Sequence, residues 1–290
     1  MNYNKLIKNK KILITGGAGF VGSNLAKRLF NNGNKVYVID NYFTGKVANH
    51  IKGVCYKRAE TTDIFALYKN IPIDYIYHLG EYSRVEQSFN EIEKVLNYNS
   101  QPFYQVLKLA KHHNAKLIYS GSSTKFSKNL ELVESPYSFS KKNNTEFLKQ
   151  FARWFKLKYA ITYFYNVYGE NEISQGKYAT VIAKFLSLKK KGASYLPITH
   201  PGTQKRRFTH IEDIVNGLIL VGKKGFGDNY GIGSKKNYTI IDLARLLKMN
   251  YKITSPKKGN RMNAALKTKK TIELGWNETK SLRNYIKNYV

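Results

Sequence analysis

The sequence predicts an α/β protein in which helices cover both faces of a doubly wound parallel sheet. Short strand-like runs alternate with helical patterns, and they occupy residues 12–14, 35–39, 54–57, 73–79 and 115–120. Apolar runs of this length are typical of parallel strands buried on both faces, and the alternation with helices predicts βαβ units. Glycine-rich or polar loops follow several of these runs, so we expect a ligand at the carboxyl ends of the strands.

The first strand leads into a glycine turn with the spacing G-x-x-G-x-x-G, formed by Gly16, Gly19 and Gly22. These glycines allow a tight turn, close approach of the backbone to a pyrophosphate, and close packing of helix on strand. The helix predicted over 20–30 places the N–H groups of its first turn, at Phe20 and Val21, toward that pyrophosphate. The turn therefore predicts a dinucleotide site of the Rossmann type.

The second strand, over 35–39, is closed by Asp40. An acid about 20 residues beyond the glycines binds the adenosine ribose hydroxyls in such sites. Its charge would repel a 2′-phosphate, so the predicted cofactor is NAD and not NADP. Asp63 and Ile64 follow the third strand and are candidate contacts of the adenine amino group; the equal alternative is that Asp63 caps a helix over 64–69.

Two later loops are predicted to face the same ligand. The strand over 73–79 leads into Leu79, Gly80 and Glu81, and the strand over 115–120 leads into a small polar run that contains Ser122. Between them, a helical pattern extends from Ile92 to His113, and Pro102 predicts a kink or a restart within it.

A helix predicted from Pro136 to about Lys156 carries Tyr137 and Lys141, which share one face because they are four residues apart. A phenol is a poor base at neutral pH. An ammonium about 4 Å away is worth about 4 kcal/mol at an effective dielectric near 20, enough to bring the phenol into the range useful for proton transfer. The pair therefore predicts an acid/base centre.

Together these residues make a family resemblance. The chain resembles the extended short-chain dehydrogenases/reductases, in particular the nucleotide-sugar branch typified by UDP-glucose 4-epimerase. The resemblance runs from Lys11 to Trp276. It rests on Thr15–Leu25, Asp40-Asn41 with Thr44-Gly45, His78-Leu79-Gly80, Asn99, Tyr137-x-x-x-Lys141, Tyr165–Gly169, Arg206–Thr209 with Asp213, Tyr230–Ser234 and Leu274–Trp276.

The resemblance implies roles for individual residues. Tyr137 would be the catalytic acid and base, Lys141 would hold the nicotinamide ribose, and Ser122 would bond the reacting sugar hydroxyl. Further implied cofactor contacts are Asn41, Gly45, Leu79, Gly80 and Asn99. The substrate would be a nucleotide-diphosphate sugar, with Asn166, Arg206 and Arg261 at the diphosphate. No metal site is expected.

Two departures from the family pattern bear on the reaction. Gly80-Glu81 replaces a common Ala-Ala, so Glu81 is a candidate substrate-binding acid/base or hydrogen-bond acceptor, unless its side chain points outward. Ser123 and Thr124 stand where 4,6-dehydratases carry an Asp-Glu pair. We therefore predict NAD-dependent epimerisation at C4 through a 4-keto intermediate. The alternatives are a nucleotide-sugar 4-ketoreductase, a 4,6-dehydratase, or a non-catalytic NAD- or nucleic-acid-binding protein.

The resemblance also predicts organisation and assembly. We expect an NAD-binding domain over residues 1–164 and a substrate-binding region over 165–290, parts of which return to the first domain. Helices are expected over 178–188 and 239–247. The chain is expected to form a homodimer through the helices before the serine loop and after Tyr137, where Phe151, Trp154 and Phe155 are predicted on the surface. Burial of these side chains within one subunit is the alternative.

The net charge of +30 has three competing explanations: nucleic-acid binding, attraction of an anionic ligand, and compositional bias. The lysines are spread along the chain without a nucleic-acid motif, so compositional bias is preferred. No apolar run approaches the ~20 residues of a membrane span. With no signal-peptide pattern and a single cysteine, Cys55, the sequence predicts a cytoplasmic protein.

Overall fold

The computed structural model describes residues 6–126, 135–263 and 265–289, and its centre is a parallel sheet of seven strands. The strand order is β11-β6-β5-β4-β1-β2-β3. The chain adds β2 and β3 on one side of β1, and then adds β4, β5, β6 and β11 on its other side. The strands are β1 (Lys11–Thr15), β2 (Lys35–Asp40), β3 (Cys55–Arg58), β4 (Tyr75–His78), β5 (Lys116–Ser122), β6 (Tyr159–Phe164) and β11 (Gly227–Ile232). This arrangement confirms the predicted doubly wound fold class.

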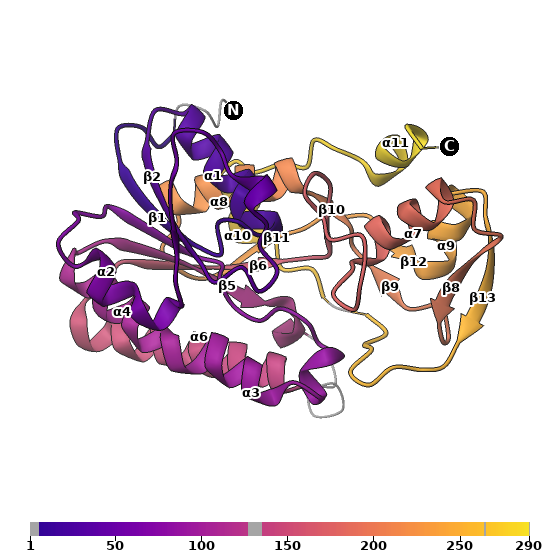
Figure 1. Cartoon of the computed structure of the whole chain (residues 1–290), viewed down its shortest axis with the longest axis horizontal. Helices are drawn as coiled ribbons and strands as arrows, with labels where there is room; N and C mark the ends of the chain where they lie inside the picture. Colours follow the sequence, from indigo (N-terminus) through magenta and orange to yellow (C-terminus); the bar gives the residue numbers. More distant parts are fainter. Residues whose placement is uncertain (1–5, 127–134, 264, 290) are drawn as a thin grey trace.

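Helices cover both faces of the sheet, as Figure 1 shows. One face is covered by α2 (Ile64–Tyr68), α4 (Gln101–His112) and α6 (Pro136–Phe155), and the other by α1 (Phe20–Asn31) and α8 (Ile211–Lys224). Successive side chains of a strand point to opposite faces. Accordingly, Leu13 lies in the first hydrophobic core, while Ile12 and Ile14 lie in the second. The three consecutive apolar residues at the centre of β1 therefore fill the cores on both sides of the sheet.

The long helical segment predicted over 92–113 is helical throughout but is not one regular helix. It consists of α3 (Ile92–Val95), a π-helical turn η5 (Leu96–Ser100) and α4. Pro102 lies in the first turn of α4, directly after the widened turn. Because proline has no N–H, it cannot donate the α-helical hydrogen bond to the carbonyl four residues earlier. The wider π-helical turn accommodates the missing hydrogen bond.

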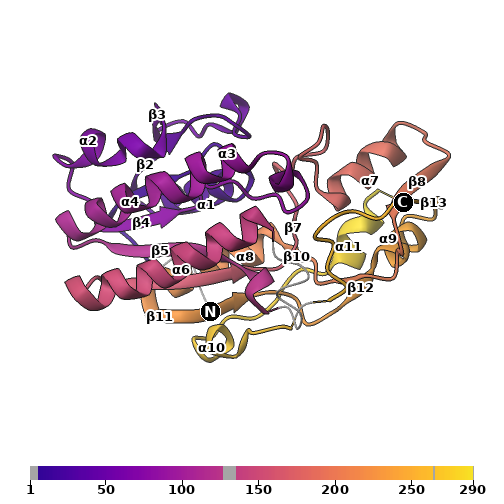
Figure 2. The ribbon, with the colours of Figure 1, turned by 90° about the horizontal axis from the view of Figure 1, so that it is seen from below.

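The chain beyond residue 165 contributes to two parts of the molecule (Figures 1 and 2). A smaller α/β region has its own core, with β8 (Tyr195–Thr199) paired to β13 (Asn250–Thr254) and β9 (Lys205–Arg206) paired to β12 (Tyr238–Thr239). The strand β11 instead pairs with β6, and α8 packs against the sheet. Elements of the smaller region include β7 (Val167–Tyr168), α7 (Val181–Lys190), β8 (Tyr195–Thr199), β9 (Lys205–Arg206), β10 (Thr209–His210), β12 (Tyr238–Thr239), α9 (Ile240–Leu246), β13 (Asn250–Thr254) and α11 (Leu282–Lys287).

The other short helical elements are η2 (Val47–Asn49), η3 (Thr61–Asp63), η4 (Gln87–Phe89), η6 (Ser123–Phe126) and α10 (Lys269–Glu273). The helices predicted over 178–188 and 239–247 correspond to α7 and α9. Among the described residues, none of the helices has the length and apolar character needed to cross a bilayer.

Candidate active site

A cleft of about 930 Å³ lies at the carboxyl ends of the strands, and the smaller region forms its opposite wall. Most of the candidate site residues that were predicted from the sequence line this cleft. They are Gly16, Gly19, Phe20, Val21, Gly22, Asp40, Asn41, Leu79, Gly80, Glu81, Ser122, Tyr137, Lys141, Asn166, Arg206 and Arg261. These residues come from both halves of the chain, so the fold assembles one site from distant motifs.

Four expected cofactor contacts lie outside this lining. Ile64 is fully buried in the core, and Asp63 is exposed in η3, where its side chain makes no capping bond to α2. Glu60 and Thr61 line the cleft nearby, because the η3 turn directs the chain away before residue 63. Gly45 lies behind Asp40, since a Cβ there would be 2.8 Å from the Asp40 Oδ1 atom.

Asn99 is the fourth of these residues, and it is buried beneath the cleft. Its Oδ1 atom accepts a hydrogen bond from the Tyr82 backbone N–H at 2.6 Å, and its Nδ2 atom donates to the Ser140 hydroxyl at 2.9 Å. The π-helical turn η5 carries Asn99 to this position. The residue thus ties the loop after β4 to α6.

The glycine turn is too tight for other side chains. Gly16 has φ +69°, and a Cβ there would lie 2.7 Å from the Gly80 Cα atom. A Cβ on Gly22 would lie 2.2 Å from the Gly16 carbonyl oxygen. Among the described residues, no side chain caps α1, so the N–H groups of its first turn remain for an anion. The turn therefore fits a dinucleotide pyrophosphate.

Asp40 is held in place by backbone donors. Its Oδ2 atom accepts a hydrogen bond from the Ala18 N–H at 2.9 Å, and its Oδ1 atom accepts one from the Tyr42 N–H at 2.8 Å. Burial raises the pKa of Asp40, although these donors act in the opposite direction. Each carboxylate oxygen can accept a second bond. The carboxylate is thus fixed at the cleft with acceptor capacity left on both oxygens, which is what a pair of ribose hydroxyls would require.

Asparagine in place of Asp40 is expected to lower the affinity for NAD about tenfold, because one of the two acceptor oxygens becomes a donor. Calorimetric titration with NAD measures the change. The same substitution at half-buried Asp74, which lies outside the cleft lining, provides the control. Unchanged affinity in the Asp40→Asn variant would contradict the role of this carboxylate.

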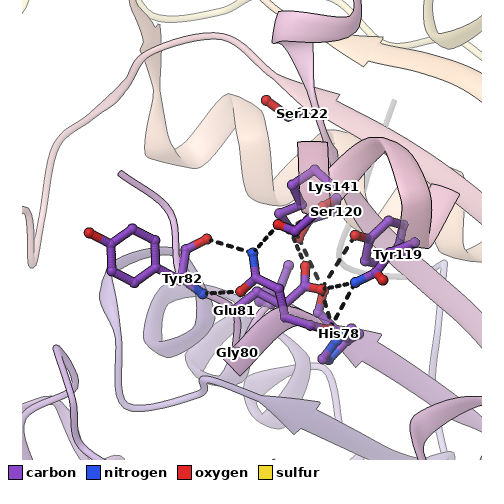
Figure 3. Close-up of polar contacts among 12 residues, drawn as sticks. His78, Gly80, Glu81, Tyr82, Tyr119, Ser120, Ser122 and Lys141 are labelled. Atoms are coloured by element: carbon purple, nitrogen blue, oxygen red, sulfur yellow. Dashed lines mark hydrogen bonds and ion pairs between the residues drawn. The ribbon is translucent and has the colours of Figure 1, made fainter. Parts of the chain in front are cut away.

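The first turns of α6 position Tyr137 and Lys141. Ser135 begins the helix with a capping box, in which its hydroxyl accepts from the Ser138 N–H at 3.1 Å and the Ser138 hydroxyl accepts from the Ser135 N–H at 2.7 Å. Lys141 is 4% exposed, and its ammonium donates to the Ser120 carbonyl at 2.6 Å. It also forms an ion pair with Glu81 (Figure 3). Tyr137 is half-buried at the cleft wall.

Ser122 ends β5 on the same wall. Its hydroxyl is within 2.8 Å of the Thr124 hydroxyl, and it accepts a further bond from the Thr124 N–H at 3.3 Å. Its side chain is therefore oriented by the short turn that follows the strand. Glu81, which was expected as a substrate contact, directs its carboxylate behind this wall toward Lys141.

Two arginines from the later part of the chain line the cleft, and neither is paired with a carboxylate among the described residues. Arg206 donates to the Asn260 side chain at 2.7 Å, and Arg261 donates to the Ser123 hydroxyl at 3.1 Å. Burial, with Arg261 as a neighbour, lowers the pKa of Arg206 to about 10. In the described part of the chain neither arginine has an ion pair, and the Nη1 atom of Arg261 has no hydrogen-bond partner. Such a pair suits a diphosphate, and Asn166 lines the cleft too.

Two further residues that line the cleft were not predicted as site residues from the sequence. Arg84 follows β4 and donates from Nε and Nη2 to the Tyr178 carbonyl at 3.0 and 2.7 Å. Burial raises the pKa of Glu172 to about 7, and the carboxyl group accepts from the Gly169 N–H at 3.3 Å. Arg84 could have been found from its place after a buried strand. Glu172 follows β7 in a loop, and no pattern there indicates a site.

A glycine turn after β1, an acid at the end of β2 and a tyrosine–lysine pair on the helix after β5 together define a dinucleotide-dependent α/β enzyme. Comparison with protein families narrows this class: the model "NAD dependent epimerase/dehydratase family" matches residues 12–233. The chain belongs to this family. The family confirms the prediction of NAD as the cofactor.

Similar proteins of known identity include UDP-glucuronic acid decarboxylase 6 of Arabidopsis thaliana, 30% identical over 266 residues, which cover 83% of this chain and 74% of that protein. Among solved structures, the UDP-glucose 4-epimerase of Thermotoga maritima with UDP-glucose has a TM-score of 0.88 at 28% identity. The match covers 96% of this chain and 97% of that chain. The epimerase Mth375 of Methanothermobacter thermautotrophicus has a TM-score of 0.91 at 25% identity, covering 100% and 93%.

Proposed function

We propose that the protein is an NAD-dependent epimerase that inverts C4 of a nucleotide-diphosphate sugar through a 4-keto intermediate. The observation that carries the proposal is that Ser122, Tyr137 and Lys141 line the same cleft as Arg206 and Arg261. The first three residues provide an acid/base centre beside the dinucleotide turn. The two arginines provide charge for the diphosphate.

In this mechanism, Tyr137 removes the proton of the sugar 4-hydroxyl, and Ser122 donates a hydrogen bond to the same oxygen. Bound NAD supplies the hydride acceptor and, later, the hydride donor. The C4 carbon thereby becomes a carbonyl carbon, and the sugar turns within the cleft to expose its other face. Tyr137 then returns the proton to the carbonyl oxygen as C4 regains a hydride. Lys141 holds positive charge beside the phenol in both directions.

A second candidate is oxidative decarboxylation of a nucleotide-linked uronic acid, which the likeness to plant UDP-glucuronic acid decarboxylases favours. Both reactions can begin with the same oxidation at C4. A 4,6-dehydratase has less support, because Ser123 and Thr124 carry hydroxyls where that reaction uses two carboxyl groups. A 4-ketoreductase remains the alternative that would release oxidised cofactor.

The test is product analysis after incubation of the purified protein with NAD and a panel of UDP-, GDP-, dTDP- and CDP-sugars that includes UDP-glucuronic acid. Mass spectrometry and NMR distinguish the reactions. An isomer of unchanged mass supports the proposal, whereas release of carbon dioxide or loss of water identifies a decarboxylase or a dehydratase. Absence of turnover with every sugar would contradict the proposed function.

We also propose a homodimer formed through α4 and α6, located in the cytoplasm as expected for a chain with one free cysteine. Apolar side chains on these helices are unusually exposed: Tyr104 by 50%, Phe139 by 53%, Trp154 by 63% and Phe155 by 44%. Phe151, predicted on the surface, is buried in the core because α6 turns it toward the sheet. One of the three side chains predicted on the surface, Phe151, therefore does not contribute to the proposed interface.

Glutamate in place of Trp154 is expected to convert the dimer into a monomer, since a charge would be buried in an apolar interface. Sedimentation velocity measures the particle mass. Phe226→Glu, at an equally exposed aromatic side chain outside α4 and α6, should leave the mass unchanged. A wild-type protein that sediments only as a monomer would exclude the dimer.

A further inference from the structure

Glu81 is a buried carboxylate directly behind the catalytic lysine. Its side chain is 1% exposed, and its Oε2 atom pairs with the Lys141 ammonium (Figure 3). Its Oε1 atom accepts from Asn144 at 2.8 Å and from the Tyr119 hydroxyl at 3.4 Å. These partners lie on β5 and α6, so the contacts hold the carboxylate between the loop after β4 and these two elements.

The neighbouring histidine extends this network to the glycine turn. The Thr15 hydroxyl accepts from the N–H groups of Leu79 and Gly80 at 3.1 and 2.9 Å, so its own hydrogen points to His78 Nδ1 at 2.7 Å. This assigns the hydrogen of neutral His78 to Nε2. That atom lies 3.5 Å from Glu81 Oε1, which is a close polar contact but not a hydrogen bond among the described residues. Thr15 immediately precedes Gly16, so the network joins the dinucleotide turn to Lys141.

The network keeps Glu81 ionised despite its burial. Burial alone would raise the pKa of Glu81, but the Lys141 ammonium and the surrounding donors lower it below its ordinary value. Burial and the Glu81 charge raise the pKa of Tyr119 well above its usual range, so its hydroxyl stays a donor. Within the cluster, the Glu81 carboxylate is therefore the counter-charge of the Lys141 side chain with which it pairs.

The negative charge of Glu81 stabilises the protonated form of the Lys141 side chain. A buried ammonium without an anion tends to lose its proton or to destabilise the fold. Glu81 and the Ser120 carbonyl occupy two of the three ammonium hydrogens at short range. The remaining contact of the ammonium, to the Ser120 hydroxyl at 3.5 Å, is at the limit of a hydrogen bond, so a ribose hydroxyl in the cleft can replace it.

We propose that Glu81 is a positioning residue for the reaction: as the counter-ion of Lys141, it fixes the ammonium and sets the pH range in which Tyr137 works as a base. The inference rests on the proposed function and deepens it. The charged or titratable groups around the pair are His78, Tyr119 and Tyr137, and Arg84 and Arg261 act on Tyr137 from other elements. Substitution of Glu81 leaves all of these in place.

The test is the pH–rate profile of Glu81→Gln. An anion raises the proton affinity of every group around it, so its removal makes the first proton easier to lose, whether Tyr137 or Lys141 loses it. We expect the acid limb of the profile to move to lower pH by about one unit, with a lower plateau rate. An acid limb at the wild-type pH in a folded variant would overturn the proposal.

Two variants separate charge from shape. Glu81→Asp retains the anion at a shorter reach, so its acid limb should stay close to that of the wild type while the rate falls. Glu146→Gln removes an exposed carboxylate from the same helix as Lys141 and should change neither. An equal shift in Glu81→Asp and Glu81→Gln would show that the charge is not what matters.

A stability measurement tests the pairing without any substrate, so it stands even if the proposed reaction fails. The melting temperature should fall in Glu81→Gln and in Lys141→Met, because each leaves one buried charge alone. The double variant should regain most of the loss. If Glu81→Gln does not fold, recovery of folding in the double variant supports the ion pair, and continued failure to fold contradicts it.

Discussion

Phenylalanine in place of Tyr137 is expected to lower kcat by about a thousand-fold while the protein still folds and binds NAD. The ring fills the same space at the cleft wall, but the group that exchanges the proton is gone, and a positioned acid/base contributes about 10²–10⁴-fold to a rate. The measurement is steady-state turnover of the nucleotide sugar that the product analysis identifies, together with calorimetric titration with NAD.

The matched control is Tyr195→Phe, which removes a hydroxyl from a tyrosine that is 40% exposed on β8. It should keep wild-type turnover. Substantial activity in Tyr137→Phe would assign the proton transfer to another group, and loss of NAD binding in that variant would show that the damage is structural.

Alanine in place of Gly16 is expected to abolish measurable NAD binding and to lower the free energy of unfolding by about 3 kcal/mol. Two costs combine here. The backbone has φ +69°, which a side chain disfavours, and the added Cβ would lie within 3.0 Å of backbone atoms of Leu79 and Gly80. The turn cannot relieve this contact without separating β1 from the loop after β4. Urea unfolding and NAD titration measure the two effects.

Gly33→Ala isolates the first cost, because Gly33 has φ +82° but its Cβ would meet nothing within 4 Å. We expect a loss of about 1 kcal/mol and unchanged NAD affinity. If the two variants lose equal stability, the close contact at Gly16 has no energetic weight.

The sequence was sufficient to predict most of the sheet because its strands carry local signals. Apolar runs and the glycine turn identify β1, β2, β4 and β5. The edge strand β11 has no such signal: Gly227–Ile232 reads Gly-Asp-Asn-Tyr-Gly-Ile, and four of its six residues are glycine or polar. It is a strand because it pairs with β6, a long-range contact that local pattern does not encode.

The site divides in the same way. Spacing within one helix predicts that Tyr137 and Lys141 share a face, and the structure brings both to the cleft. The partner of Glu81 could not be predicted, because the ion pair joins residues 60 positions apart, and only the packing of α6 on β5 places them together. Asp63 is exposed because it lies in a single turn of 3-10 helix, which turns its side chain away from the cleft. Sequence patterns do not predict the position of so short a turn.

The position of β11 in the chain, more than 60 residues after its partner β6, has a consequence for folding during synthesis. When β6 leaves the ribosome, its outer partner has not been made, and the whole of β8 and α7 must follow first. The nascent chain therefore carries an open, largely apolar strand edge, which invites pairing with other chains until β11 arrives. A polypeptide cut at residue 165 would keep that edge permanently and would also lack α8. The two halves of this enzyme are thus inseparable as folding units, although they are distinct as working parts.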